Sequence, residues 1–177
     1  RHWPHPIVWI GRLITSLEEE FRSRVKDEVL AGLLLVIMVL MLVGFAAISA
    51  LKIVGGIAGF FQILLALWLT ASCLALRGLH LESKAVIEAL EAEDVTGARQ
   101  ALSMIVGRET AQLDEEEILR ATIETVAENA SDGVIAPLFY LCLGGPVAAL
   151  LYKAVNTMDS MIGYKNERYL KFGRVAA

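Results

Sequence analysis

Two short motifs in this chain combine carboxylate and amide side chains, a pairing that suits metal and phosphate chemistry. The first is Glu128-Asn129-Ala-Ser-Asp132-Gly133, in which two carboxylates and an amide lie within five residues. Oxygen donors at this density suit Mg²⁺, which proteins hold through one or two carboxylates while substrate phosphates complete the coordination. An exposed helix end followed by an Asp-Gly turn is the alternative interpretation.

The second motif, Asn156-Thr-Met-Asp159, repeats the Asn-x-x-Asp pattern. On a helix, Asn156, Asp159 and Ser160 share one face. An apolar run separates the two motifs, and a hairpin fold of that run would bring Asp132 and Asp159 toward each other across its base. Polar residues at the edge of a membrane helix usually mark a functional site, so the two motifs are predicted to act on one bound Mg²⁺-phosphate group.

Cationic side chains follow the second motif, accompanied by a tyrosine. These residues are Tyr164, Lys165, Arg168 and Lys171. They are predicted to hold phosphate or carboxylate groups, with Arg acting as a bidentate fork and Lys as a point charge. Binding of anionic lipid beside the membrane would use the same residues. Near the start of the chain, His5 between two prolines is either a ligand contact or part of a local turn.

Other signals exclude several kinds of site. Cys73 and Cys142 both lie within apolar runs, so they are predicted to be buried hydrophobes and not a metal pair or disulfide. The scattered histidines do not make a zinc site. No Walker-type phosphate loop, dinucleotide-binding loop or nucleophile elbow occurs. Any nucleotide must therefore be held by an unusual site, and no nucleic-acid partner is expected.

The elements that position these residues are predicted to be membrane helices. Hydrophobic residues make up 56% of the 177, and the mean hydropathy is +0.57, an excess typical of a bilayer protein. Residues 29–50 and 54–76 carry no charge, and Lys52 is the only charge in the short connection predicted between them. Each run is long enough to cross about 30 Å of hydrocarbon as a helix. Basic residues before the first run place the N-terminus in the cytoplasm. They are Arg12, Arg22, Arg24 and Lys26.

Residues 81–128 are predicted to form amphipathic helices on the cytoplasmic side. Asp114 with Glu117 makes a capping-box pair, which fixes the start of a helix that runs to about Glu128. That helix carries one polar stripe, which leads into the first motif. The stripe consists of Arg120, Glu124 and Glu128.

The third apolar run, residues 134–155, is interrupted by Pro137 and by Gly144-Gly145-Pro146, which a straight helix disfavours. A full crossing would place the basic tail outside, against the charge rule, so we favour a broken or re-entrant helical hairpin. A third full span is the alternative. The predicted fold is an all-α, polytopic, multi-pass protein of the cell (inner or plasma) membrane, with residues 1–177 as a single membrane domain and its polar segments in the cytoplasm.

These polar segments resemble one family closely. The matching segments are the run from Glu128 to Tyr140, then Gly144-Gly145-Pro146, then the run from Asn156 to Lys165. Together they resemble the adenosylcobinamide-phosphate synthase family of cobalamin biosynthesis (the CobD/CbiB family), and the likeness covers nearly the whole chain. The likeness has one mild departure, because Glu109 occupies a position where the family pattern leads us to expect Asp. Because the family's chains continue well beyond Ala177, the sequence is expected to be a fragment.

The resemblance implies a membrane-bound, amide-forming ligase that uses ATP as co-substrate and Mg²⁺ as cofactor. It would join a carboxylate of adenosylcobyric acid, a corrinoid, to the amine of aminopropanol or aminopropanol phosphate. The other partner would be the lipid bilayer, and a homo-oligomer stays open.

The expected site residues follow from the motifs and the resemblance together. The catalytic set is Glu128, Asp132, Asp159 and Asn156, with Glu128, Asp132 and Asp159 as the metal ligands. The substrate- or phosphate-binding set is Arg120, Asn129, Lys153, Ser160, Tyr164, Lys165, Arg168 and His5.

Two other functions fit the same motifs. A membrane prenyl- or phosphotransferase also uses acidic x-x-Asp motifs at helix ends to hold a metal-bound diphosphate, and it would take a lipid substrate. A transporter or membrane sensor, which is no enzyme, fits the broken helix at the bilayer edge. Binding of a corrinoid separates the ligase from both.

Overall fold

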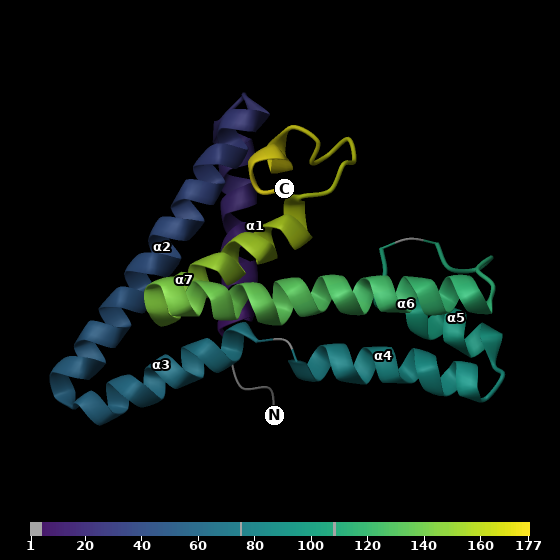
Figure 1. The fold of residues 1–177 in the computed structure, drawn as a ribbon. Coiled ribbons are helices and arrows are strands. Elements are labelled where there is room, and N and C mark those ends of the chain that lie inside the picture. The colour runs from purple at the N-terminus through teal and green to yellow at the C-terminus, as the bar shows by residue number, and fades with distance from the viewer. Residues whose placement is uncertain (1–4, 75, 108) are drawn as a thin grey trace. The chain divides into compact units, whose positions relative to one another are not determined.

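The computed structural model describes residues 5–74, 76–107 and 109–177, and within these ranges the chain is helical with no strand (Figure 1). The all-α class predicted from the sequence is confirmed for this part of the chain. The chain divides into two compact units, one made of Arg1–Cys73 with Pro137–Ala177 and the other of Leu74–Ala136. The assignment of residues 1–177 to one membrane domain stays a prediction.

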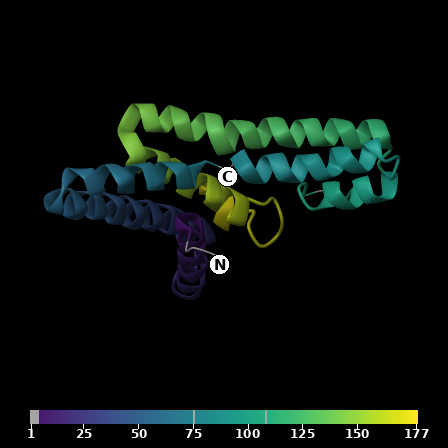
Figure 2. The same cartoon turned by 90° about the horizontal axis from the view of Figure 1, so that it is seen from below.

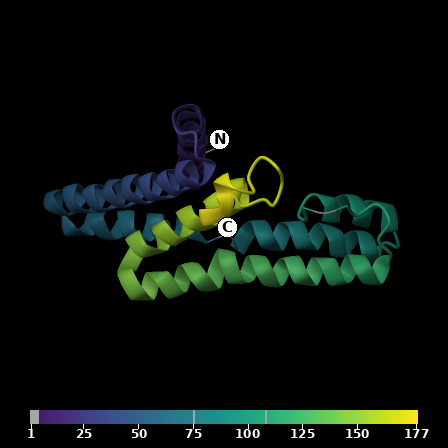
Figure 3. The same ribbon diagram turned by 90° about the horizontal axis from the view of Figure 1, so that it is seen from above.

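The first unit contains α1 (Pro6–Arg24), α2 (Glu28–Ile57) and α3 (Gly59–Cys73), together with most of α7 (Ala136–Ile162) and the short helix η2 (Phe172–Val175). Asp27 caps α2, because its carboxylate accepts hydrogen bonds from the N–H groups of Val29 and Leu30. Helix α3 turns back from the end of α2 and contacts it, and Figure 1 shows the two helices diverging from that turn, which Figures 2 and 3 show from below and from above.

The boundary between α2 and α3 differs from the predicted one. The charge at Lys52 suggested a connection between the runs 29–50 and 54–76, whereas α2 continues through Lys52 to Ile57. The turn comes at Ala58, whose φ of −161° and ψ of 132° are extended. A lysine does not break a helix, because its long apolar stem lets the ammonium group reach a polar surface. Helix α2 is thus longer than predicted and α3 shorter.

Two helical stretches among the described residues are long and apolar enough to cross a membrane, Glu28–Ile57 and Glu115–Ile162. In the first, only 33% of the most apolar window is buried within the structure. Phe45 and Ile57 are 73% and 75% exposed. The core helix of a water-soluble protein would be mostly covered, so the outward apolar faces suit a hydrocarbon surrounding. By length and composition alone, these two stretches are compatible with a membrane protein, and the membrane location and the number of crossings stay predictions.

Helix α7 is bent where the sequence predicted a break. Gly144 has a φ of −144° and ψ of 20°, and Gly145 has a φ of 69° and ψ of −164°, a combination that residues with a side chain rarely adopt. Tyr140 and Tyr152 stack across this point with ring centroids 4.9 Å apart. In a straight helix their twelve-residue separation would span about 18 Å. The predicted fold-back is therefore present, whereas re-entry into a bilayer stays a prediction.

The segment after α7 is seated against α2 by close backbone approaches. A Cβ atom at Gly32 would lie 1.8 Å from the carbonyl oxygen of Phe172, and one at Gly173 would lie 1.8 Å from that of Ile162. Phe172 itself is fully buried. Neither glycine tolerates a side chain unless the backbone moves, so residues 163–177 have a defined position on the first unit.

The second unit contains α4 (Leu76–Glu91), α5 (Val95–Ser103), α6 (Glu115–Ala130) and the π-helical turn η1 (Ser131–Ile135). The predicted capping box is confirmed: Asp114 accepts from the N–H of Glu117, and the Glu117 carboxylate accepts from the N–H of Asp114. A small apolar core joins these helices. Its fully buried residues are Val86, Ala98, Leu102, Ile118 and Ala121.

The two cysteines differ. Cys73 is buried, as predicted, and its thiol donates to the carbonyl of Leu69 with 3.3 Å between sulfur and oxygen. Cys142 is exposed, so the prediction of a buried side chain is wrong there. It lies beside Leu143, which is 68% exposed, on the first arm of α7. An apolar run implies burial only when another protein segment covers it, and here none of the described residues does.

Candidate functional site

The first motif lies at the end of α6 and in η1. Glu128 and Asn129 are exposed on the last turn of α6, and Asp132 is half-buried in the π-helical turn. Within the described residues, no hydrogen bond or ion pair involves the side chain of Glu128 or Asp132. Their oxygens remain free to bind an external group. A hydrated Mg²⁺ fits this donor set, since one or two carboxylates are its usual protein ligands and phosphate oxygens complete the shell.

The π-helical turn around Asp132 was missed by the sequence analysis. The N–H of Ala136 donates to the carbonyl of Ser131, five residues back, where an α-helix would use the carbonyl of Asp132. Its cause is readable in the sequence. Pro137 has no N–H for the carbonyl of Gly133, and its ring would crowd that carbonyl in a regular helix. Single π-helical turns occur frequently at functional sites.

The second motif lies near the end of α7, which runs to Ile162, so Asn156, Asp159 and Ser160 are on one helical face as predicted. The Lys153 ammonium donates to the side-chain oxygen of Asn156 at 3.0 Å. The Ser160 hydroxyl donates to the backbone carbonyl of Asn156 at 2.9 Å. Asp159 is exposed, and no described side chain pairs with its carboxylate. Asn156 therefore presents its amide N–H groups in a fixed direction.

The two motifs fall in different units, Asp132 in Leu74–Ala136 and Asp159 in Pro137–Ala177. Their action on one metal ion stays a prediction. No group of three His, Cys, Asp or Glu side chains that would hold a metal occurs among the residues that the structure describes. A metal held here would depend on substrate oxygens as well as on protein carboxylates.

Of the predicted anion-binding residues, Arg120 lies on the α6 stripe. Its guanidinium is 3.2 Å from the carboxylate of Glu124, and the Arg120 side chain is 80% exposed. His5 is the exposed residue before α1 and makes no side-chain cap for that helix. The structure thus gives Arg120 a carboxylate partner, and the binding roles of both residues stay predictions.

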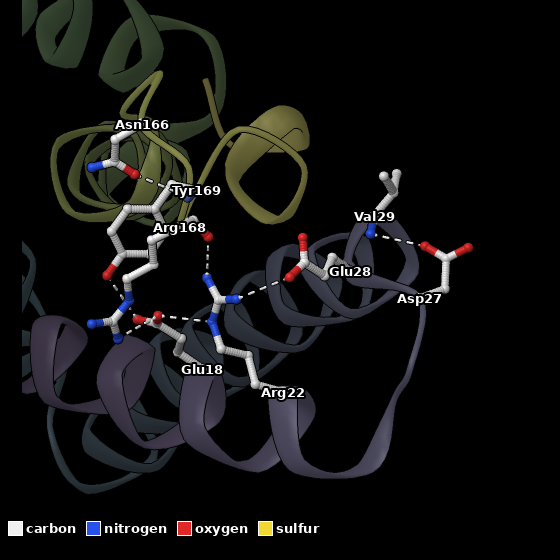
Figure 4. A network of polar contacts seen from close by, with 8 residues as sticks. All are labelled: Glu18, Arg22, Asp27, Glu28, Val29, Asn166, Arg168 and Tyr169. Carbon is white, nitrogen blue, oxygen red and sulfur yellow. Dashed lines mark hydrogen bonds and ion pairs between the residues drawn. The ribbon is translucent and has the colours of Figure 1, made fainter.

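Arg168 belongs to a set of polar contacts centred on a buried carboxylate, here called the Glu18 network (Figure 4). The side chain of Glu18 is only 7% exposed, and one of its oxygens accepts from Arg22 and Arg168 at 3.0 Å each. Arg22 also donates to the backbone carbonyl of Arg168 at 2.8 Å. Its guanidinium lies 4.0 Å from the centre of the Phe172 ring. The network therefore ties α1 to residues 168–172.

The Glu18 network also shifts two pKa values. The hydrogen bond and the negative charge of Glu18 raise the pKa of Arg168. Burial, and then the charge of Glu18, raise the pKa of the Tyr169 hydroxyl, which lies 3.4 Å from the Glu18 carboxylate. Glu18 was not predicted as a functional residue from the sequence. A signal was present, because Glu18 continues the buried stripe of Ile10 and Ile14 at four-residue spacing.

The segment after α7 also lines a hollow of about 430 Å³, here called the cationic pocket. Tyr164, Lys165 and Lys171, which the sequence predicted to bind anions, lie in its wall. Lys171 and Arg174 add two further positive charges, and no Asp or Glu lines it. Within the described residues, none of these three cations forms an ion pair. Arg174 was not predicted as a binding residue from the sequence, because only the path of the loop places it in the same wall as Lys165.

A larger hollow, of about 630 Å³, lies between α1, α2 and α3. Its walls are apolar and include Trp9, Phe45 and Trp68. Such a lining offers contact area for a hydrocarbon chain and no groups for catalysis.

Comparison with known proteins gives consistent matches along the whole chain. A family model described as CobD/Cbib protein matches residues 1–177. Proteins named cobalamin biosynthesis protein CobD from Pelobacter propionicus and Geobacter metallireducens are each 51% identical over 100% of this chain, which covers 55% and 56% of their lengths. The one from Clostridium tetani is 45% identical over 97% of this chain and 55% of its own.

The chain thus spans about half the length of the curated relatives it matches. No solved structure matches it. The family model covers every residue of the chain. The chain therefore belongs to the CobD/Cbib family.

Proposed function

We propose that this chain is part of an ATP- and Mg²⁺-dependent ligase that joins adenosylcobyric acid to aminopropanol or aminopropanol phosphate. Family membership supports a biosynthetic role, because the relatives are named cobalamin biosynthesis proteins. The observation that carries the chemical proposal is the pair Glu128 and Asp132, two carboxylates at a π-helical turn without a partner among the described residues. Such a pair suits a Mg²⁺-bound nucleotide.

Amide formation from a carboxylate requires activation, and a phosphoryl group supplies it. A carboxylate oxygen of the corrinoid attacks the terminal phosphorus of ATP, ADP leaves, and an acyl phosphate results. The amine nitrogen then attacks the acyl carbon, inorganic phosphate leaves, and the nitrogen loses a proton. Both steps depend mainly on positioning and on neutralisation of phosphate charge.

The residues of this chain have distinct roles in the proposal. Glu128, Asp132 and Asp159 would hold Mg²⁺, which would neutralise the phosphate charge. Asn156, oriented by Lys153, and Asn129 would place phosphate or carboxylate oxygens. The remaining proposed contacts to anionic groups are Arg120, Lys153, Ser160, Tyr164, Lys165, Arg168 and His5.

The proposed location is the cell membrane, with several crossings and with the polar segments in the cytoplasm. The exposed apolar faces of α2 support a bilayer surrounding. Single cysteines at positions 5, 128 and 165, tested with a reagent that does not cross membranes, decide the orientation. All three are expected to be protected in intact cells and labelled after permeabilisation. Labelling of position 128 or 165 from outside would reject it.

The reaction is tested with the full-length protein in detergent, incubated with adenosylcobyric acid, ATP, Mg²⁺ and each amine in turn. Mass spectrometry should show the amide, with one ADP formed for each product molecule. Asp132→Asn should abolish most of the turnover while Glu115→Gln, an exposed acidic residue in the first turn of α6, should not. ADP release without amide, or turnover without Mg²⁺, would contradict the proposal.

The apolar hollow favours one second candidate, a membrane prenyl- or phosphotransferase with a lipid substrate. Its 630 Å³ would accept a hydrocarbon chain, and the acidic motifs would hold a metal-bound diphosphate. Corrinoid binding separates the two candidates, since only the ligase requires it.

A further inference from the structure

We infer that the cationic pocket is a binding site for a phosphate group, held by Lys165, Lys171 and Arg174. The inference deepens the anion-binding role that the proposed function gives to Lys165, and to that extent rests on it. Lys171 was predicted from the sequence to bind anions but has no role in the proposed reaction, and Arg174 was given no role by either.

The charges around the pocket favour an anion. Lys165, Lys171 and Arg174 all line it, and its remaining wall residues include neither Asp nor Glu. By contrast, Arg168 of the same segment is paired with Glu18. Three cations that face one hollow repel each other, and a bound anion relieves that repulsion. These three exposed cations therefore favour an anionic ligand, whereas Arg168 already has a carboxylate partner.

The backbone of the loop that carries these cations is ordered before any ligand arrives. The Asn166 carbonyl accepts from the N–H of Leu170 at 2.8 Å, and the Tyr169 carbonyl accepts from the N–H of Gly173 at 2.7 Å. The side-chain oxygen of Asn166 accepts from the N–H of Tyr169. Phe172 is fully buried beneath the loop. Binding to a preformed loop loses little conformational entropy, which distinguishes this pocket from lysines on a mobile tail.

The shape and chemistry of the pocket favour a phosphate group. Its 430 Å³ falls in the range of roughly 300–1,000 Å³ typical of small-molecule sites. Arg174 offers a planar fork of donors that matches phosphate oxygens, and the two lysines add mobile point charges. The group would belong either to a soluble phosphate compound or to the headgroup of an anionic lipid. Both sources present the same oxygens.

The binding experiment uses the purified protein in detergent, with sodium pyrophosphate as the probe and EDTA present throughout. Isothermal titration calorimetry should detect binding that weakens as salt is added. Lys171→Gln and Arg174→Gln are each expected to weaken it about ten-fold or more, because each removes a charged hydrogen-bond donor. Arg174→Lys should recover part of the loss. Arg12→Gln, an exposed cation on α1 outside the pocket, is the matched control and should bind like the wild type.

A second arm identifies the source of the phosphate. Dihexanoyl phosphatidylglycerol and dihexanoyl phosphatidylcholine are titrated as soluble short-chain lipids. Pyrophosphate binding that neither lipid displaces identifies a soluble phosphate compound. Binding of phosphatidylglycerol but not of phosphatidylcholine, lost in Lys171→Gln and Arg174→Gln, identifies an anionic headgroup. If neither probe binds, or if the Gln variants bind both probes like the wild type, the inference is wrong.

The phosphate site and the ligase reaction can be rejected independently of each other. EDTA removes any contribution from metal at the carboxylates, so pyrophosphate binding with no ligase turnover would reject the reaction and keep the pocket. If a correctly folded Arg174→Gln variant has normal turnover and also binds pyrophosphate normally, the phosphate site is rejected and the ligase reaction is supported. Circular dichroism and thermal melting check the fold of each variant.

Discussion

The Glu18 network and the cationic pocket both use residues of the short segment after α7, but among the described residues the charges are paired in the network and unpaired in the pocket. In the network, the buried carboxylate of Glu18 meets two guanidinium groups at 3.0 Å. In the pocket, Lys165, Lys171 and Arg174 line one hollow whose wall contains no Asp or Glu side chain. Charges paired inside the protein contribute to its stability, whereas charges without a partner are available to a ligand. The segment therefore has one structural side and one binding side.

The same contrast separates the acidic residues. Glu18 is buried and paired, while Asp132 and Asp159 have no partner among the described side chains. Substitutions should thus divide into those that lower activity or binding with little effect on folding, and those that lower stability first.

The largest effect is expected at the unpaired carboxylates. Asp132→Asn and Asp159→Asn should each lower turnover on the order of a hundred-fold, and the double variant should lose little more, because residues that act as a unit are strongly non-additive. Turnover is measured with the full-length protein at saturating and at limiting Mg²⁺. Losses that multiply in the double variant would mean that the two motifs do not share a site.

The next largest effect, on stability, is expected where residues 163–177 approach α2 at Gly32. Gly32→Ala places a Cβ atom on the carbonyl oxygen of Phe172, so the backbone must shift at a cost of about 2 kcal/mol. Gly56→Ala, where no atom lies within 4 Å, is the matched control and should be neutral or slightly stabilising. Thermal melting in detergent compares them. Equal melting temperatures would show that the segment is not seated as described.

Glu18→Gln is expected to lower stability by about 1.5 kcal/mol, because it removes the charge that two arginines share in a buried position. Glu20→Gln, in the exposed pair with Arg24, should change almost nothing. Pyrophosphate affinity should stay near the wild-type value in both variants below their melting temperatures. A loss of affinity in Glu18→Gln as large as in Lys171→Gln would break the distinction between the two regions.

A smaller effect is expected from Tyr169 at alkaline pH. Its pKa in the folded protein is raised above the usual value of 10.0, so the unfolded chain loses this proton first as the pH rises. The resulting stability is complete below about pH 10 and is lost as the pH rises through the folded pKa. Melting temperatures between pH 8 and pH 11 should therefore fall less in Tyr169→Phe than in the wild type. Parallel curves would contradict this.

The smallest effect is expected from the cysteines, which carry no charge in either region. Cys73→Ala and Cys142→Ala should each leave turnover within a few-fold of the wild type, although Cys73→Ala removes a buried side chain and should lower the melting temperature somewhat. A collapse of turnover with the fold intact would assign one of them a role in the site.

The sequence predicted best what depends on neighbours in the chain. The capping box of Asp114 and Glu117 and the break at Gly144 and Gly145 follow from local backbone chemistry, and both are confirmed. The end of α2 was placed too early because a charge at Lys52 was taken as a break. The π-helical turn at Ser131 went unnoticed, although Pro137 provides a local cause for it.

The features that could not be predicted from the sequence depend on contacts between distant parts of the chain. Glu18 acquires its role only when α1 meets Arg168, and Arg174 joins Lys165 only through the course of the loop after α7. Exposure was misjudged for a similar reason. Cys142 lies in an apolar run, but hydrophobicity alone does not reveal whether protein or another surrounding covers it.

The separation of Glu18 and Arg168 in the chain has a consequence for the order in which the protein is made. The two residues are 150 positions apart. At roughly 5–20 residues per second, a ribosome takes about 8 to 30 s to go from one to the other. During that interval Glu18 has no Arg168 to meet, and Lys171 and Arg174 of the pocket are not yet synthesised. The phosphate site therefore appears only after both α1 and α2 have been synthesised, so a nascent chain cannot engage its ligand early.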